Sequence, residues 1–177
     1  MVDASHSGSA GGGIPKQRSD GVHRRTRLHH VGVQTNDLDN SESWYHDFFQ
    51  CHRTWSLSTF SDLTLQRLPG IRRLSELVVG DVRVHLFERP GHPAVQPGTS
   101  ITQFQHVCVA VDTPEDLTVF RERWIELFES GRYTYALPDE PTEIVVDADG
   151  VQSFYTYDVN GLEFEFTYVP PGDVDGA

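Results

Sequence analysis

The stretch LHHVGV at residues 28–33 has a counterpart in FQHVCV at residues 104–109. Each is followed by a second strand-like stretch, VRVHLFERP at residues 82–90 and LEFEFTYVP at residues 162–170. His106 follows His30 by 76 residues, and Glu165 follows His85 by 80. A nearly constant spacing in a chain of 177 residues indicates an internal duplication.

Each half of the chain predicts a strand, then a helix, then two or three further strands. Residues 37–41 supply helix-capping side chains, and the aromatic residues at positions 44, 45, 48 and 49 fall on one face of a short helix. In the second half, TPED at residues 113–116 predicts a capped helix that ends before Gly131. Two-residue hairpin turns are expected at residues 80–81 and 160–161.

Composition predicts the domain boundaries. Residues 1–26 are poor in large apolar side chains and are expected to be a flexible tail. The expected order then continues with a first module at 27–90, a linker at 91–101, a second module at 102–170 and a short tail at 171–177.

Charge and cysteine content narrow the class of protein. A net charge of −12 argues against a nucleic-acid or anionic-membrane surface. Two cysteines do not make a disulfide framework, and neither a signal peptide nor a membrane-length apolar run is recognised. We therefore expect a cytoplasmic protein whose partner is a small-molecule substrate.

Strand alternation separates four candidate metal ligands from the apolar side chains. In each of the four strand-like stretches one face is uniformly apolar and can pack on the helices. The opposite faces carry the candidates, which are His30, His85, His106 and Glu165. His29 falls on the apolar face and is expected to be a capping or packing residue. Three imidazoles and one carboxylate favour Zn, Fe(II), Ni, Co or Mn over Mg or Ca.

These features resemble the vicinal oxygen chelate superfamily, which includes glyoxalase I, methylmalonyl-CoA epimerase, extradiol dioxygenases and the bleomycin and fosfomycin resistance proteins. HVGV at residues 30–33 is similar to the family's opening strand. DVNGLEFEF at residues 158–166 is similar to its closing D-P-x-G-x-x-x-E signature, with valine where proline is usual. The resemblance implies an α+β fold with two βαβββ modules that form a curved mixed sheet around a metal. By position it also implies the four ligands His30, His85, His106 and Glu165.

The predicted hairpins suggest a catalytic residue and the walls of a pocket. Counting back from the turn at residues 80–81 pairs Glu76 with His85. Glu76 is therefore predicted to be the general base or a hydrogen-bond acceptor that orients His85, with an exposed strand carboxylate as the alternative. The same counting in the second hairpin pairs Thr156 with Glu165. The expected substrate-pocket residues are Gln34, Phe87, Phe154 and Thr156.

Three functions fit this pattern. The first is a metal-dependent isomerase, epimerase, lyase or cyclase that abstracts a proton next to a metal-bound carbonyl of a small oxygenated substrate. The second is a non-haem Fe(II) ring-cleaving dioxygenase, although extradiol members leave the position of His85 without a ligand. The third is a metal-free antibiotic-binding resistance protein, against which four candidate ligands argue. Family members pair modules within or between chains, so a homodimer is also compatible with the sequence.

Overall fold

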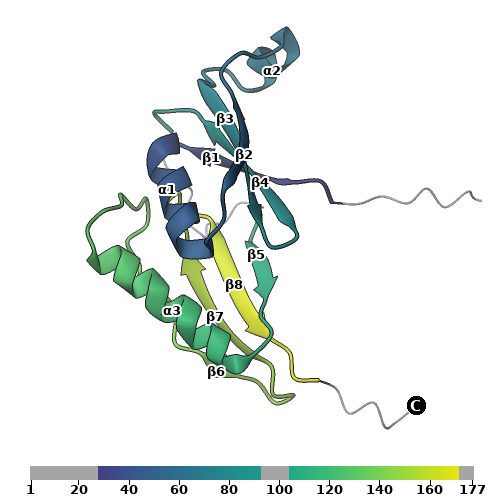
Figure 1. The fold of residues 1–177 in the computed structure, drawn as a ribbon, viewed down its shortest axis with the longest axis vertical. Coiled ribbons are helices and arrows are strands. Elements are labelled where there is room, and N and C mark those ends of the chain that lie inside the picture. Colours follow the sequence, from purple (N-terminus) through teal and green to yellow (C-terminus); the bar gives the residue numbers. More distant parts are fainter. Residues whose placement is uncertain (1–27, 93–103, 172–177) are drawn as a thin grey trace, which may run out of the picture.

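Two modules of similar topology build the protein (Figure 1), whose computed structural model describes residues 28–92 and 104–171. The tails expected at 1–26 and 171–177 and the linker expected at 91–101 lie largely outside the described residues. Figure 1 shows the modules end to end, with their long helices on the same side. In the part of the chain that the structure describes, no helix is long and apolar enough to span a membrane.

The first module is a four-stranded mixed sheet with one long helix. Its elements are β1 (Val31–Thr35), α1 (Leu38–Phe49), β2 (Arg53–Leu57), α2 (Asp62–Arg67), β3 (Arg73–Val79) and β4 (Val82–Glu88). The strands are ordered β1-β4-β3-β2, with β1 parallel to β4 and the other pairs antiparallel. The middle segment, where only strands were expected, also contains the short helix α2, which is capped by Ser61.

The second module repeats this topology. Its elements are β5 (His106–Ala110), α3 (Pro114–Glu129), β6 (Val145–Val146), β7 (Gln152–Tyr157) and β8 (Glu163–Tyr168). The strands are ordered β5-β8-β7-β6, and β5 runs parallel to β8. The predicted α+β fold of two βαβββ modules is thus confirmed. The two sheets are separate, and β1 and β5 each lie at a sheet edge among the described strands.

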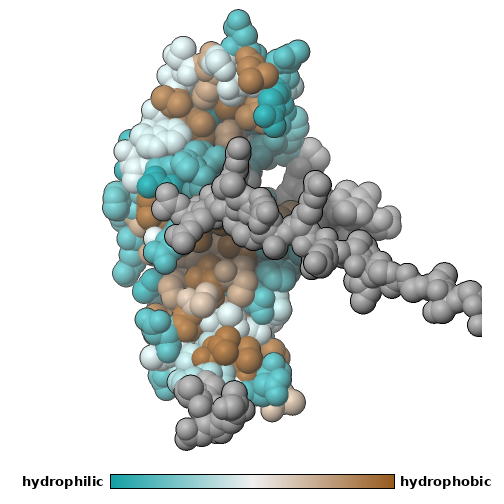
Figure 2. Space-filling view, turned by 90° about the vertical axis from the view of Figure 1, so that its right-hand side faces the viewer, coloured by the Kyte–Doolittle hydropathy of each residue, from teal (hydrophilic) through white to brown (hydrophobic). Residues whose placement is uncertain are grey.

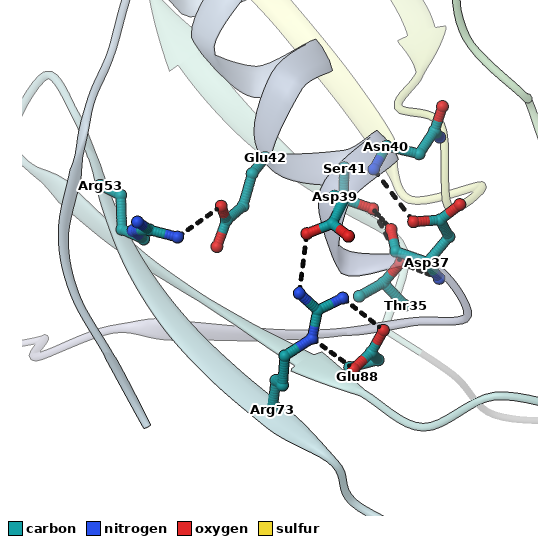
Figure 3. Close-up of polar contacts among 9 residues, drawn as sticks. All are labelled: Thr35, Asp37, Asp39, Asn40, Ser41, Glu42, Arg53, Arg73 and Glu88. Carbon is teal, nitrogen blue, oxygen red and sulfur yellow. Dashed lines mark hydrogen bonds and ion pairs between the residues drawn. The ribbon is translucent and has the colours of Figure 1, made fainter. Parts of the chain in front are cut away.

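Polar side chains fix the start of both long helices. The Asp37 carboxylate accepts a hydrogen bond from the backbone N–H of Asn40 at 3.1 Å, which caps α1. Arg73 on β3 donates two hydrogen bonds to Glu88 on β4 and a third to Asp39 in the first turn of α1 (Figure 3). In the second module, α3 begins at the cap predicted from residues 113–116, where Thr113 and Asp116 form a capping box. These contacts orient each helix against the apolar face of its sheet.

One hydrophobic core joins the modules, and α1 lies at its centre. Trp44, Tyr45 and Phe48 of α1 are fully buried, as is Trp124 of α3. Full burial of each such side chain contributes about 1.5–3 kcal/mol. The Tyr45 hydroxyl donates a 2.8 Å hydrogen bond to the buried carboxylate of Asp158 in the second module. The relative position of the modules is therefore set on the helix side of the sheets.

The two hairpins differ in how well their register follows from sequence. In the first, Glu76 pairs with His85, which confirms the predicted register. In the second, Tyr155 pairs with Glu165, so the predicted pairing of Thr156 with Glu165 is wrong by one residue. The cause is Asp158, whose carboxylate accepts hydrogen bonds from the backbone N–H groups of Asn160 and Leu162. These bonds lengthen the turn beyond two residues.

Candidate metal centre

The first module brings together two of the predicted ligands. His30 directly precedes β1, and His85 lies in the middle of the neighbouring strand β4. Their imidazole rings are stacked, with centroids 3.8 Å apart and an interplanar angle of 6°. Burial of His30 and the neighbouring His85 and His29 lower the pKa of His30 below its ordinary value of 6.5. His30 is therefore a neutral imidazole at neutral pH, the form that binds metals.

Glu76 is a buried carboxylate whose oxygens are already engaged. Its side chain is 2% exposed. One oxygen, Oε1, accepts hydrogen bonds from the Thr54 hydroxyl and from Arg83, both at 2.7 Å. The other, Oε2, lies 2.9 Å from Nε2 of His85. The hydrogen bond from Thr54, together with that from His85 and the positive charge of Arg83, outweighs the effect of burial and lowers the pKa of Glu76 to about 2.

The environment of Glu76 determines which nitrogen of His85 can bind a ligand. An ionised carboxylate only accepts hydrogen bonds, so His85 must carry its proton on Nε2. This leaves Nδ1 free to coordinate, as in carboxylate–histidine pairs around metals. A carboxyl group with a pKa of about 2 and no free oxygen is poorly suited to accept a proton from a substrate. Of the two roles predicted for Glu76, general base and acceptor that orients His85, the geometry favours the second.

The second module brings together the other two predicted ligands. His106 begins β5, and Glu165 lies in the adjacent strand β8, with its Oε2 3.2 Å from Nε2 of His106. Both side chains are partly exposed, at 35% and 18%. The Tyr155 hydroxyl donates a 3.0 Å hydrogen bond to the second carboxylate oxygen. Burial and this hydrogen bond raise the pKa of Tyr155, so its phenol keeps its proton at neutral pH.

The two ligand pairs do not meet within one chain. Among the described residues, the one group of three or more metal-binding side chains with converging atoms consists of His29, His30 and His85. His106 and Glu165 are not members of this group. In the described residues the four predicted ligands thus form two separate pairs, one on each module, which we call half-sites.

The sequence matches one protein family over most of its length. Residues 27–166 match the model of the Glyoxalase/Bleomycin resistance protein/Dioxygenase superfamily. The chain belongs to this superfamily. No curated protein matches it.

Solved structures of the superfamily share the fold. A glyoxylase/bleomycin resistance protein/dioxygenase domain from Frankia sp. EAN1pec is similar at 16% identity and a TM-score of 0.64, covering 84% of this chain and 96% of its own. The fosfomycin resistance protein FosX from Listeria monocytogenes is similar at 16% identity and a TM-score of 0.57, covering 82% and 94%. Lactoylglutathione lyase from Agrobacterium tumefaciens is similar at 18% identity and a TM-score of 0.52, covering 86% and 98%.

The predicted pocket residues divide between the two faces of the sheets. Phe87 lies on the ligand side, where its ring packs over Gly32, and Gln34 accepts a 2.6 Å hydrogen bond from Arg89. Phe154 and Thr156 are buried on the helix side, so their expected place in a pocket is corrected. The shifted register of the second hairpin is the reason, and it puts Tyr155 beside Glu165 instead.

Two side chains near the first half-site were not predicted to belong to it. Trp55 on β2 pairs with Glu76, and its ring centroid lies 5.0 Å from that of His85. His29 was placed on the apolar side by strand alternation. However, β1 begins at Val31, so alternation does not apply to His29, whose Nδ1 lies 2.9 Å from that of His30. The consecutive histidines were the signal in the sequence that could have found it.

Proposed function

We propose that this protein is a metal-dependent enzyme that abstracts a proton next to a carbonyl of a small oxygenated substrate. The observation that supports this most is that corresponding strands of both modules carry a ligand pair. His30 and His85 stand on or beside β1 and β4, as His106 and Glu165 do on β5 and β8. FosX from Listeria monocytogenes shares the fold, and its crystal structure in complex with Mn(II) is similar to this chain with a TM-score of 0.53. When bound, a divalent transition metal would polarise the substrate carbonyl.

We further propose that a second copy of the chain completes each site. Among the described strands both β1 and β5 have a free edge, and an unpaired strand edge is a ready partner for another strand. Pairing β1 of one copy with β5 of another would join the two half-sites in one sheet. A two-fold axis would create two such composite sites in a dimer.

An apolar cavity between the modules supports this pairing. The cavity has a volume of about 680 Å³ and is lined by valines of both edge strands, Val31 and Val33 of β1 and Val107 and Val109 of β5. Figure 2 shows apolar residues at the surface around the middle of the molecule, between the two modules. Three of these valines are only half-buried, and covering the cavity with a second copy would remove more of their apolar surface from water.

The polar groups on the ligand side suggest how a proton would be moved. Glu76 keeps His85 in the tautomer that can coordinate, through the hydrogen bond to Nε2. Glu163 pairs with His106 on the neighbouring strand, is half-buried and accepts a single long hydrogen bond of 3.4 Å from Tyr157. Glu163 is thus a freer carboxylate than Glu76 and the better candidate for the proton acceptor. Glu163 would return the proton that it has accepted, and Tyr155, whose phenol keeps its proton at neutral pH, would hold Glu165 in place.

Metal uptake and hydrogen exchange test this proposal together. Metal content should be measured on wild type and on His106→Ala, with the exposed His52→Ala as control. The metal-loaded protein should then be incubated in deuterated water with small ketones, keto acids and thioesters. We expect metal-dependent deuterium incorporation at the carbon next to the carbonyl, lost in Glu163→Gln. Retention of exchange in Glu163→Gln together with its loss in Glu76→Gln, with both variants saturated with metal, would return the role of base to Glu76.

The dioxygenase alternative predicts a different result in the same experiment. Iron-loaded protein would consume oxygen with catechols, and no metal-dependent deuterium incorporation would occur. Four protein ligands count against this function, because a catechol and O₂ together need more open positions on the ion. A protein that takes up no metal in any preparation would contradict both enzymatic functions.

A further inference from the structure

We propose that His29 is a metal ligand, so that the first module alone can hold a divalent transition metal through His29, His30 and His85. The inference concerns the same site as the proposed function and rests on it for the presence of a metal. It differs in requiring neither the second module nor a second copy. No strand of the fold fixes His29, which precedes β1 in the chain.

The positions of the three imidazoles carry the inference. One ring nitrogen from each histidine lies within 4.8 Å of the other two. Two nitrogens bound to one ion at about 2.1 Å can lie at most about 4.2 Å apart, and adjacent octahedral ligands lie about 3 Å apart. The 2.9 Å between the Nδ1 atoms of His29 and His30 matches the adjacent spacing. Small rotations of the side chains would bring all three nitrogens to a common centre.

The contact between His29 and His30 is one that a cation can replace. Their Nδ1 atoms face each other at 2.9 Å, so one of them donates a hydrogen bond to the other, and a bound ion would take the place of that proton. A divalent cation would satisfy both nitrogens and the free nitrogen of His85 at the same time. Glu76 would stabilise the arrangement from behind His85 without being a ligand itself.

The chemistry of the cluster defines the class of ion. Three neutral nitrogen donors and no direct carboxylate favour Zn, Co, Ni or Cu over Mg or Ca, which prefer oxygen ligands. His29 and His30 are both exposed, which leaves coordination positions open to water. A single chain would thus bind a transition metal first, and His106 and Glu165 of the opposite module would add to the site when a second copy pairs with it.

A Co(II) and Zn(II) titration of the full chain tests the inference. The variants are His29→Ala and His106→Ala, with His52→Ala as a control for the loss of an exposed histidine. We expect His29→Ala to weaken metal binding at least about tenfold, because the loss of a group that merely supports a ligand already costs about 10–100-fold. The visible absorption of bound Co(II) should also change, whereas His52→Ala should behave as wild type.

The variants separate this inference from the proposed function. If His29→Ala binds metal within twofold of wild type while His106→Ala is weakened, the inference is wrong and the four-ligand site stands. If His29→Ala is weakened and His106→Ala is not, the three-histidine site stands and the four-ligand site fails. If metal-free His29→Ala unfolds at the same temperature as metal-free wild type, its weaker metal binding does not come from misfolding.

Discussion

Replacing Glu76 with glutamine should damage both the stability of the fold and the affinity for metal. A glutamine has one accepting oxygen and one donating nitrogen, whereas Glu76 accepts from Thr54 and Arg83 on one oxygen and from His85 on the other. If the amide nitrogen faces Arg83, two donors oppose each other in a buried site. If it faces His85, the imidazole must carry its proton on Nδ1, which can then no longer coordinate.

The pKa of Glu76 gives the size of the effect on stability. A fall of the pKa from 4.5 to about 2 corresponds to about 3 kcal/mol in favour of the ionised folded state. Because the folded-state pKa is depressed, this stabilisation is fully present above about pH 4.5 and is lost as the pH falls towards 2. Wild type should therefore exceed Glu76→Gln by up to about 3 kcal/mol at pH 7, and the difference should shrink in acid.

Urea denaturation across this pH range measures the stability, and competition with a chromophoric chelator measures the metal affinity. We expect the affinity of Glu76→Gln to fall about 10–100-fold. Glu143→Gln is the matched control, since Glu143 pairs with Arg121 at the surface and is 86% exposed. The reasoning is refuted if the metal affinity of Glu76→Gln is within twofold of wild type and its free energy of unfolding falls in acid by as much as that of wild type.

Three further changes test how the fold holds the half-sites. Tyr45→Phe removes a buried hydrogen bond to the carboxylate of Asp158 and should lower the free energy of unfolding by about 1.5–3 kcal/mol. Calorimetry would show this as a fall in Tm of about 2–4 °C per kcal/mol. Tyr168→Phe is the control and should leave Tm unchanged, because the Tyr168 hydroxyl makes no hydrogen bond to the described residues. Asp37→Ala removes the cap of α1 and should cost about 1 kcal/mol in urea denaturation, with no effect on metal affinity. Gly32→Ala places a Cβ 3.0 Å from the Phe87 ring and should cost about 1 kcal/mol, recovered when Phe87 is also replaced by leucine. A Gly32→Ala variant as stable as wild type would show that the ring moves aside freely.

Local signals in the sequence predicted the modules well. The internal repeat, the capping residues of both long helices and the turn after Val79 each depend on neighbouring residues alone. For the same reason, the pairing of Glu76 with His85 followed from counting across a tight turn. The proximity of the two candidate ligands within each module could likewise be predicted, because strand alternation and parallel pairing place them side by side.

Three features were not predicted correctly, and only the last of them depends on contacts between distant residues. The second hairpin shifted by one residue because the Asp158 side chain binds two backbone N–H groups of its own turn. Alternation misplaced His29 because β1 begins two residues after it. The separation of the half-sites could not be predicted either, since it depends on how the two modules pack on their shared core and not on any local pattern.

Mixing two inactive variants tests most directly whether one site is shared by two chains. His85→Ala damages the half-site of the first module, and His106→Ala damages that of the second. In a mixed dimer with composite sites, one site collects both changes and the other collects none. Random reassociation of the two variants should then restore about a quarter of the high-affinity metal sites. If mixing restores no high-affinity site, while wild type treated in the same way retains its own, the site does not form across two chains.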